Sequence, residues 1–298
     1  APVGVMPDGF ADKPAAAALV GAVFGQSRPV IVTVDSARQL EPVFLRLWEE
    51  LWPAAKARFS FCTGAPMPRA VAGSLIDLQA VPRAIPSSQF RKSAGAALVV
   101  DLRAQATPDA WVELVLERAS QGDTAFRSWM EAAVGAEASR SAVPSLMPIF
   151  GGWHAAHWSA RAVLANVVTA PELEPVTRAR LVGMVFDRAG ADGGSARRRE
   201  LLQELCVQRD ADLSSMTSLL ERQTRRLFEE SRTEGYSLTI SLLGAELTEA
   251  GEQVLRTAVR SLTPSDVEVF GDAETALLPS LVGVNPSLAA APELWRRA

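Results

Sequence analysis

The pattern of hydrophobic and polar positions divides the chain into two parts, and the first part carries the strand signals. The run PVIVTV at 29–34 is β-branched and nearly continuous, which is typical of a strand buried on both faces. Further strands are predicted at 59–63, 75–81 and 96–102. Apolar positions three and four residues apart predict helices at 15–24 and 40–51, with Pro42 in the first turn and Pro53 at the end of the second helix. These elements predict a small α/β or α+β sheet unit.

After residue 102 the pattern becomes helical almost throughout. A capping residue followed by proline marks predicted helix starts at Thr107, Thr263 and Asn285. Three apolar stripes predict helix faces: Leu181, Val182, Val185 and Phe186; Leu213, Met216, Leu219, Leu220, Leu227 and Phe228; Val254, Leu255, Ala258, Val259 and Leu262. The run YSLTISLL at 236–243 alternates as a strand would, and we interpret it as helix. We therefore expect an α/β domain at 1–104 and a helical bundle or irregular helical stack at 105–298.

Composition narrows the class of protein. The net charge of −4 argues against a general polyanion binder, so no nucleic-acid partner is expected. No apolar run approaches the roughly 18 residues that a membrane span requires. The two cysteines form no disulfide framework, which favours a reducing cytoplasm. Because the chain begins at Ala1, we expect it to be a piece of a longer protein.

The stretch RFSFCTG at 58–64 places Cys62 at the end of a predicted strand, where an α/β fold can expose a nucleophile. A histidine would have to activate the thiol, and the chain has only His154 and His157. Their order after Cys62 is compatible with a cysteine hydrolase, although the local signatures of papain-like and caspase-like enzymes are missing. Because free cysteine is among the most buried residue types, we favour a structural role and keep the hydrolase as an alternative.

The two histidines are three residues apart, so on a helix they would share a face and could bind a metal together. Two ligands are too few, and no adjacent Cys, Asp or Glu completes a set, so no metal site is predicted. The flanking Trp153 and Trp158 indicate a packed helix that starts after the glycine pair at 151–152. We expect these tryptophans to pack internally or to contact a partner.

No phosphate-binding loop is present, since GxxxxGK[ST] and GxGxxG are both absent, and no cofactor is predicted. The segment AGADGGSARRRE at 189–200 resembles an anion site at a helix start. We favour a flexible loop at 189–195 that leads into a solvated run of arginines at 197–199. Asp35 follows the first predicted strand and Asp101 lies at the end of the last one, and we expect both to act as caps or turn residues.

The predicted helix that includes residues 219–228 carries a mixed charged face. Its arginines are Arg222, Arg225 and Arg226, and its acidic residues are Glu221, Glu229 and Glu230. Mixed charges at these spacings are typical of a solvent-exposed or partner-binding face, whereas a nucleic-acid stripe would be more one-sided. We therefore name the three arginines as candidate partner-binding residues, together with the two tryptophans.

The combination of LWEELWPAAKARFSFCT, IDLQAVP and the closing strand AALVVDL resembles the middle region of bacterial GTPase-associated proteins. The matching elements are Trp48, Trp52–Pro53, Arg58–Thr63 and Asp77–Pro82, and the resemblance covers residues 40–102. That family is associated with bacterial conflict and antiviral defence systems. The resemblance implies an accessory or adaptor component that works beside an effector or a GTPase, and it carries over no active site.

Three hypotheses of function follow. The leading one is a non-catalytic, cytoplasmic protein-interaction or adaptor segment of a bacterial defence or signalling assembly, with protein partners and no membrane contact. The second is a cysteine hydrolase that uses Cys62 with His154 or His157. The third is a degenerate nucleotide-binding domain that has lost its phosphate loop.

Overall fold

The structure is a computed structural model. It describes residues 13–36, 40–86, 88, 95–102, 107–120, 124–135, 139–170, 173–208, 213–267 and 277–292. The chain forms two compact units. The first unit contains Ala1–Trp158 and Ala170–Thr177, and the second contains Ser159–Thr169 and Arg178–Ala298.

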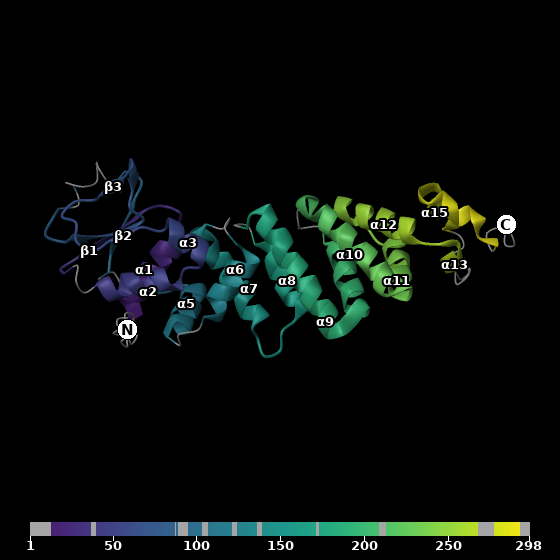
Figure 1. Cartoon of the computed structure of the whole chain (residues 1–298), viewed down its shortest axis with the longest axis horizontal. Helices are drawn as coiled ribbons and strands as arrows, with labels where there is room; N and C mark the ends of the chain where they lie inside the picture. The colour runs from purple at the N-terminus through teal and green to yellow at the C-terminus, as the bar shows by residue number, and fades with distance from the viewer. Residues whose placement is uncertain are drawn as a thin grey trace. The chain divides into compact units, whose positions relative to one another are not determined.

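A parallel sheet organises the first unit. Its strands are β1 (Val30–Val34), β2 (Phe61–Cys62), β5 (Leu78–Pro82) and β6 (Leu98–Asp101), in the order β2-β5-β1-β6. Figure 1 labels β1 and β2 in the purple and blue part of the ribbon, which is the N-terminal part of the chain. In the central strand, Val30 lies opposite Leu78 of β5 and Leu98 of β6. All residues of β1 except Thr33 are buried, as the continuous apolar run predicts. The expected fold class, a small sheet unit followed by a mainly helical part, is confirmed.

The strand predicted at 75–81 is two separate strands. Its first residue belongs to a hairpin of β3 (Ala70–Val71) and β4 (Ser74–Leu75), and β5 begins only at Leu78. Gln79 of β5 is buried, and its side chain forms hydrogen bonds with the backbone of Arg69 and Ile76. These residues flank the hairpin, so the bonds hold its two ends together and separate it from β5. The strand predicted at 59–63 is likewise only the two residues of β2.

Helices complete the first unit. They are α1 (Lys13–Phe24), α2 (Glu41–Glu50), α3 (Pro53–Arg58), α5 (Ala110–Ser120), α6 (Ala125–Ala133), the 3-10 turn η2 (Arg140–Ala142) and α7 (Val143–Trp153). Phe44 of α2 meets Phe61 of β2 edge to face, with ring centroids 6.1 Å apart. Pro42 lies in the first turn of α2 as predicted, whereas Pro53 opens α3. The helix predicted from Pro108 begins two residues later, at Ala110. The Asp109 carbonyl accepts hydrogen bonds from the backbone of Val112 and Glu113.

The predicted domains 1–104 and 105–298 do not coincide with the two compact units. Helices α5, α6 and α7 come after residue 105 but belong with the sheet. The reason is packing, since α5 lies against α1 and α7 lies against α5. Trp111 and Val112 of α5 are the side chains nearest to Gly25 and Gly21 of the α1 region. The change from strand to helix along the sequence is therefore not the boundary of a compact unit.

The second unit is helical throughout its described residues. It contains α8 (Ala160–Thr169), most of α9 (Pro175–Val207), the 3-10 turn η3 (Ser214–Met216), α10 (Thr217–Glu230), α11 (Arg232–Leu243), α12 (Glu249–Ser261), α13 (Pro264–Val267), α15 (Leu278–Val284) and η4 (Pro286–Ala290). The three predicted apolar stripes are buried, apart from the half-buried Leu255. The run at 236–243 lies in α11, so its interpretation as helix is confirmed. Helix starts after Thr263 and Asn285 are confirmed as well.

The flexible loop predicted at 189–195 is wrong for most of its length. Residues 189–193 continue α9, and the two helical segments meet at Gly194, whose φ of +65° lies in the left-handed region that favours glycine. Gly190 is needed for a different reason, because a Cβ there would overlap the guanidinium of Arg198. The glycines of this segment therefore allow a kink and a close approach within a helix.

We predict that Gly235→Ala destabilises the second unit. A Cβ at this position of α11 would lie 2.7 Å from ring carbons of buried Phe228 in α10, so the ring or the helix must shift. The expected loss in the free energy of unfolding is about 1–3 kcal/mol, measured by chemical denaturation. Gly283→Ala in α15 is the matched control, since its Cβ would meet nothing within 4 Å. The control should gain about 0.5–1 kcal/mol from helix propensity, and equal effects at the two sites would contradict this packing.

Candidate functional site

Cys62 and the two histidines lie in different surroundings within the first unit. Cys62 ends β2 opposite Gln79 of β5 and is half-buried. His154 directly follows α7, and its ring centroid lies 4.4 Å from that of Phe150. His157 is exposed in the turn that leads to α8. These positions lend no support to a thiol–imidazole pair, so the hydrolase stays a prediction.

The histidines do not share a helix face. The glycine pair at 151–152 lies inside α7, which ends at Trp153, so the helix start predicted there is wrong. The chain instead turns, and the rings of Trp153 and Trp158 pack together with centroids 5.7 Å apart. Both tryptophans are half-buried. In the part of the chain that the structure describes, no group of three His, Cys, Asp or Glu residues could hold a metal ion.

The solvated run of arginines predicted at 197–199 is wrong for Arg198, whereas the Arg197 side chain is 40% exposed. The side chain of Arg198 is only 1% exposed, and it donates to Gln223 at 2.5 Å and to Glu230 at 3.2 Å. The missing side chain of Gly190 leaves the space for this guanidinium. Arg198 therefore joins the second segment of α9 to α10, and its bound donors make it a structural cation.

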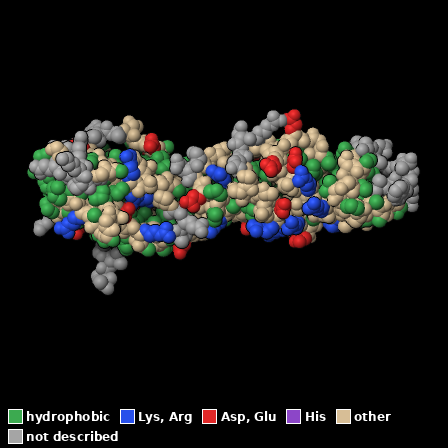
Figure 2. All heavy atoms as spheres, turned by 90° about the horizontal axis from the view of Figure 1, so that it is seen from above, with side chains coloured by type: hydrophobic (Ala, Val, Ile, Leu, Met, Phe, Trp, Pro, Cys, Tyr) green, Lys and Arg blue, Asp and Glu red, His purple; other side chains and the backbone are tan. Residues whose placement is uncertain are grey.

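The mixed charged face of α10 lies at the surface but is partly paired within the unit. Arg225 pairs with Glu221 at 3.3 Å, and Arg226 pairs with Asp187 at 2.8 Å. Arg222 is exposed and has no hydrogen bond or ion pair among the described residues. Figure 2 shows basic and acidic side chains interspersed over one face of the molecule. Exposed ion pairs contribute little to stability, so a partner can replace them at small cost.

Asp35 and Asp101 lie where the sequence places them, after β1 and at the end of β6, and they share a cation. Arg83, just after β5, approaches Asp35 at 3.4 Å and Asp101 at 2.8 Å. This edge of the sheet is where a nucleotide would bind in an α/β fold. The described residues there form an ion-paired cluster, and the nucleotide-binding hypothesis stays a prediction.

An apolar groove of about 390 Å³ opens in the second unit between α11, α12 and α15. Its apolar lining consists of Leu242, Leu243, Ala245, Leu247, Leu255, Val259, Leu281 and Val284. Polar groups lie among the lining residues as well, and Glu252 and Arg256 form an exposed ion pair at 3.2 Å. The groove thus has an apolar floor with one exposed ion pair beside it.

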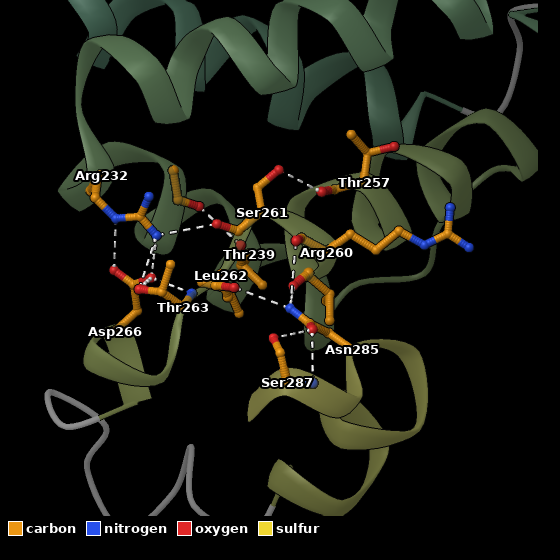
Figure 3. Close-up of polar contacts among 12 residues, drawn as sticks. Arg232, Thr239, Thr257, Arg260, Ser261, Leu262, Thr263, Asp266, Asn285 and Ser287 are labelled. Atoms are coloured by element: carbon orange, nitrogen blue, oxygen red, sulfur yellow. Dashed lines mark hydrogen bonds and ion pairs between the residues drawn. The ribbon is translucent and has the colours of Figure 1, made fainter. Parts of the chain in front are cut away.

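Asn285 holds one wall of the groove in place. Its buried side-chain amide donates to the backbone oxygens of Val259 at 2.9 Å and Leu262 at 3.0 Å, at the end of α12. Figure 3 shows the bond from Asn285 to Leu262. Its Oδ1 accepts from the backbone and the hydroxyl of Ser287. Asn285 therefore caps η4 as the sequence predicts and also ties the end of α15 to α12. This second contact could not be read from the sequence.

Arg232 and Asp266 fix the turn that follows α12. Arg232 donates to Asp266 and to the Ser261 carbonyl, and Asp266 accepts from the backbone and the hydroxyl of Thr263 at 2.6 and 2.7 Å (Figure 3). Burial by itself raises the pKa of Asp266, but the hydrogen bonds from Arg232 and Thr263 outweigh burial and hold the pKa below its usual value. The hydrogen bond with Asp266 raises the pKa of Arg232. The pair is thus charged at neutral pH.

The described residues that line the groove include no cysteine or histidine, and the carboxylate among them, Glu252, is paired with Arg256. Cys206, the other thiol of the chain, is completely buried, and burial raises the pKa of that thiol to about 12. The arrangement can therefore hold apolar side chains but offers no activated nucleophile. The periodicity of the sequence predicts which positions of α12 are apolar, but it does not show which of them lie in the core and which line the groove.

Comparisons with protein-family models, with curated proteins and with solved structures found no match to the chain. Among the described residues, no helix is both long enough and apolar enough to cross a membrane.

We predict that Asp266→Asn destabilises the second unit in a pH-dependent way. The wild-type carboxylate has a lowered pKa in the folded state, so its contribution to stability is present above its unfolded pKa and is lost as the pH falls through the folded value. At pH 7 the variant should lose about 1–2 kcal/mol in the free energy of unfolding. Denaturation at several pH values should show the difference shrinking below about pH 4.

The control for that experiment is Asp187→Asn. Asp187 also pairs with an arginine, Arg226, but its side chain is 62% exposed. An exposed pair is expected to contribute less than about 1 kcal/mol. A loss in Asp266→Asn that is no larger than in the control, or that does not change with pH, would contradict the role given to this carboxylate.

We also predict that the two thiols differ in reactivity. Cys62 is half-buried, whereas Cys206 is buried with a raised pKa, so only Cys62 should react with a disulfide reagent in the native protein. Thiol titration should count one reactive group in the native state and two in denaturant. The Cys62→Ser variant should lose the native signal, and rapid native labelling of Cys206 would show that the second unit opens at this site.

Proposed function

We propose that the chain is a non-catalytic protein-interaction module, and that the groove of the second unit binds an apolar segment of a protein partner. The groove itself is the observation that supports this function most directly. Its volume of about 390 Å³ lies within the range of established binding pockets, and its lining is mainly aliphatic. Hydrogen bonds from the side chains of Asn285 and Arg232 to backbone carbonyls at the end of α12 hold this wall of the groove in place, so little ordering is needed on binding.

The occupant that fits this groove best is an amphipathic helix of the partner. Three helices form the walls, and leucines and valines cover the floor, which suits apolar anchors spaced three and four residues apart. The ion pair of Glu252 and Arg256 offers polar contacts to such a helix. The exposed Arg222 adds a cation on the same unit, although the proposal does not depend on it.

The biological setting that we propose is a bacterial defence or signalling assembly. It rests on the resemblance of residues 40–102 to the middle region of bacterial GTPase-associated proteins. In such an assembly the module would join an effector or a GTPase to other components, and it would need no catalytic group of its own. The mainly apolar chemistry of the groove is compatible with that role.

Val284→Asp tests the proposal. Val284 lines the groove and is 38% exposed, so a carboxylate there should leave the fold intact while it disfavours an apolar occupant. The tagged chain is purified from the cells that encode it, and the partner is quantified by mass spectrometry. Recovery should fall at least about tenfold, as expected when a buried apolar contact is replaced by a charge.

Val207→Asp is the matched control, because Val207 is 39% exposed in α9 and does not line the groove. Wild type and the control should capture the same partner to the same extent. Cys62→Ser should do so as well, since the proposed function needs no thiol. Equal recovery with Val284→Asp, or the absence of any specific partner, would refute the proposal.

A further inference from the structure

A second pocket, in the first unit, has a different chemistry. It has a volume of about 260 Å³ and lies beside the amino ends of β1, β2 and β5. The polar side chains in its lining are Ser27, Arg58, Asp77, Ser139 and Arg140, and Phe59 contributes an aromatic ring. These residues come from four separate stretches of the chain, which the fold brings together.

The carboxylate in this pocket, Asp77, already has hydrogen-bond donors for both of its oxygens. One oxygen of Asp77 accepts from Nη1 of Arg140 at 2.7 Å, and the other accepts from the backbone and the hydroxyl of Ser60, both at 2.9 Å. The Arg140 side chain is only 10% exposed, donates also to the Arg28 carbonyl, and lies 5.3 Å from the centre of the Phe59 ring. The charges of Asp77 and Arg140 therefore cancel within the wall of the pocket.

The remaining polar groups are donors. Arg58 is exposed and has no hydrogen bond or ion pair among the described residues. The oxygen of Ser139 accepts from the backbone and the hydroxyl of Ser141, so its own hydrogen is available to the pocket. The hydroxyl of Ser27 likewise has no partner in the described part of the chain. The lining thus presents one net positive charge and free donors around a satisfied carboxylate.

We propose that this pocket binds an oxyanion, a carboxylate or phosphate group, with Arg58 as its main ligand. A guanidinium offers a planar pair of donors that matches two oxygens of either group, and serine hydroxyls can complete the coordination. The volume is below the range for drug-sized ligands, so the occupant is a small anion or the anionic end of a larger molecule. This site lies in the other unit from the groove, and either proposal can fail without the other.

The test uses inorganic phosphate and acetate as probes. Each is titrated into the full chain at constant ionic strength, with sodium chloride as the compensating salt, and thermal unfolding is followed. Because a ligand that binds only the folded state raises its stability, specific binding should give a saturable rise in the unfolding temperature. A response to both probes indicates carboxylate-type recognition, and a response to phosphate alone indicates a tetrahedral site.

Arg58→Gln should weaken binding at least about tenfold, since it removes the only unpaired charge among the described residues of the pocket. Arg222→Gln is the matched control, because Arg222 is also exposed and unpaired in the described part of the chain but lies on α10. Arg58→Lys should restore part of the affinity through its charge. Circular dichroism checks that each variant is folded.

Two outcomes would overturn the proposal. One is a rise in the unfolding temperature that does not saturate with phosphate or acetate, or that chloride produces equally. Such a rise would reflect general screening of charges by salt. The other is equal binding by wild type, Arg58→Gln and Arg222→Gln, which places any bound anion elsewhere. Neither outcome would bear on the groove, whose test measures capture of a protein by the second unit.

Discussion

Helix carboxyl ends leave backbone carbonyls without partners in their own helix, and both units of this protein depend on how those carbonyls are satisfied. At the end of α2, Arg127 donates to the Glu49 carbonyl at 2.9 Å. At the end of α9, Thr248 donates to the Cys206 carbonyl from both its backbone and its hydroxyl. Asn285 does the same at the end of α12. Each bond satisfies a helix end and fixes a second element against it.

Arg198 also joins two elements by satisfying hydrogen-bonding groups, but here the buried group is a full charge. A buried guanidinium is tolerated only where its donors are bound, and removing one partner of such a pair is strongly destabilising. Here Gln223 and Glu230 supply the acceptors from α10, and Gly190 supplies the space. The kink at Gly194 separates the two segments of α9 that meet around this cation. Arg198, which the sequence places in a solvated run, is thus buried in the core, whereas Gly193 and Gly194 at the kink are exposed.

The periodicity of the sequence predicted those features that are set by residues close together along the chain. The buried β1, the apolar faces of α9, α10 and α12, and the capping role of Asn285 all follow from spacing within about one or two turns. Spacing could not predict the second contact of Asn285, which reaches α12 across 23 to 26 residues, or that of Arg140, which reaches the turn after α1 across 112 residues or more. The groove and the oxyanion pocket are made of such long-range contacts.

The two edges of the sheet explain why the unpaired charge lies where it does. In open parallel sheets, ligands usually bind at the carboxyl edge of the strands. Among the described residues at that edge, Arg83 is shared between Asp35 and Asp101, so its charge is neutralised. At the amino edge Asp77 is neutralised by Arg140, and Arg58 has no counter-charge among the described residues. Electrostatics alone therefore directs a small anion to the amino edge, opposite to the position that the topology by itself favours.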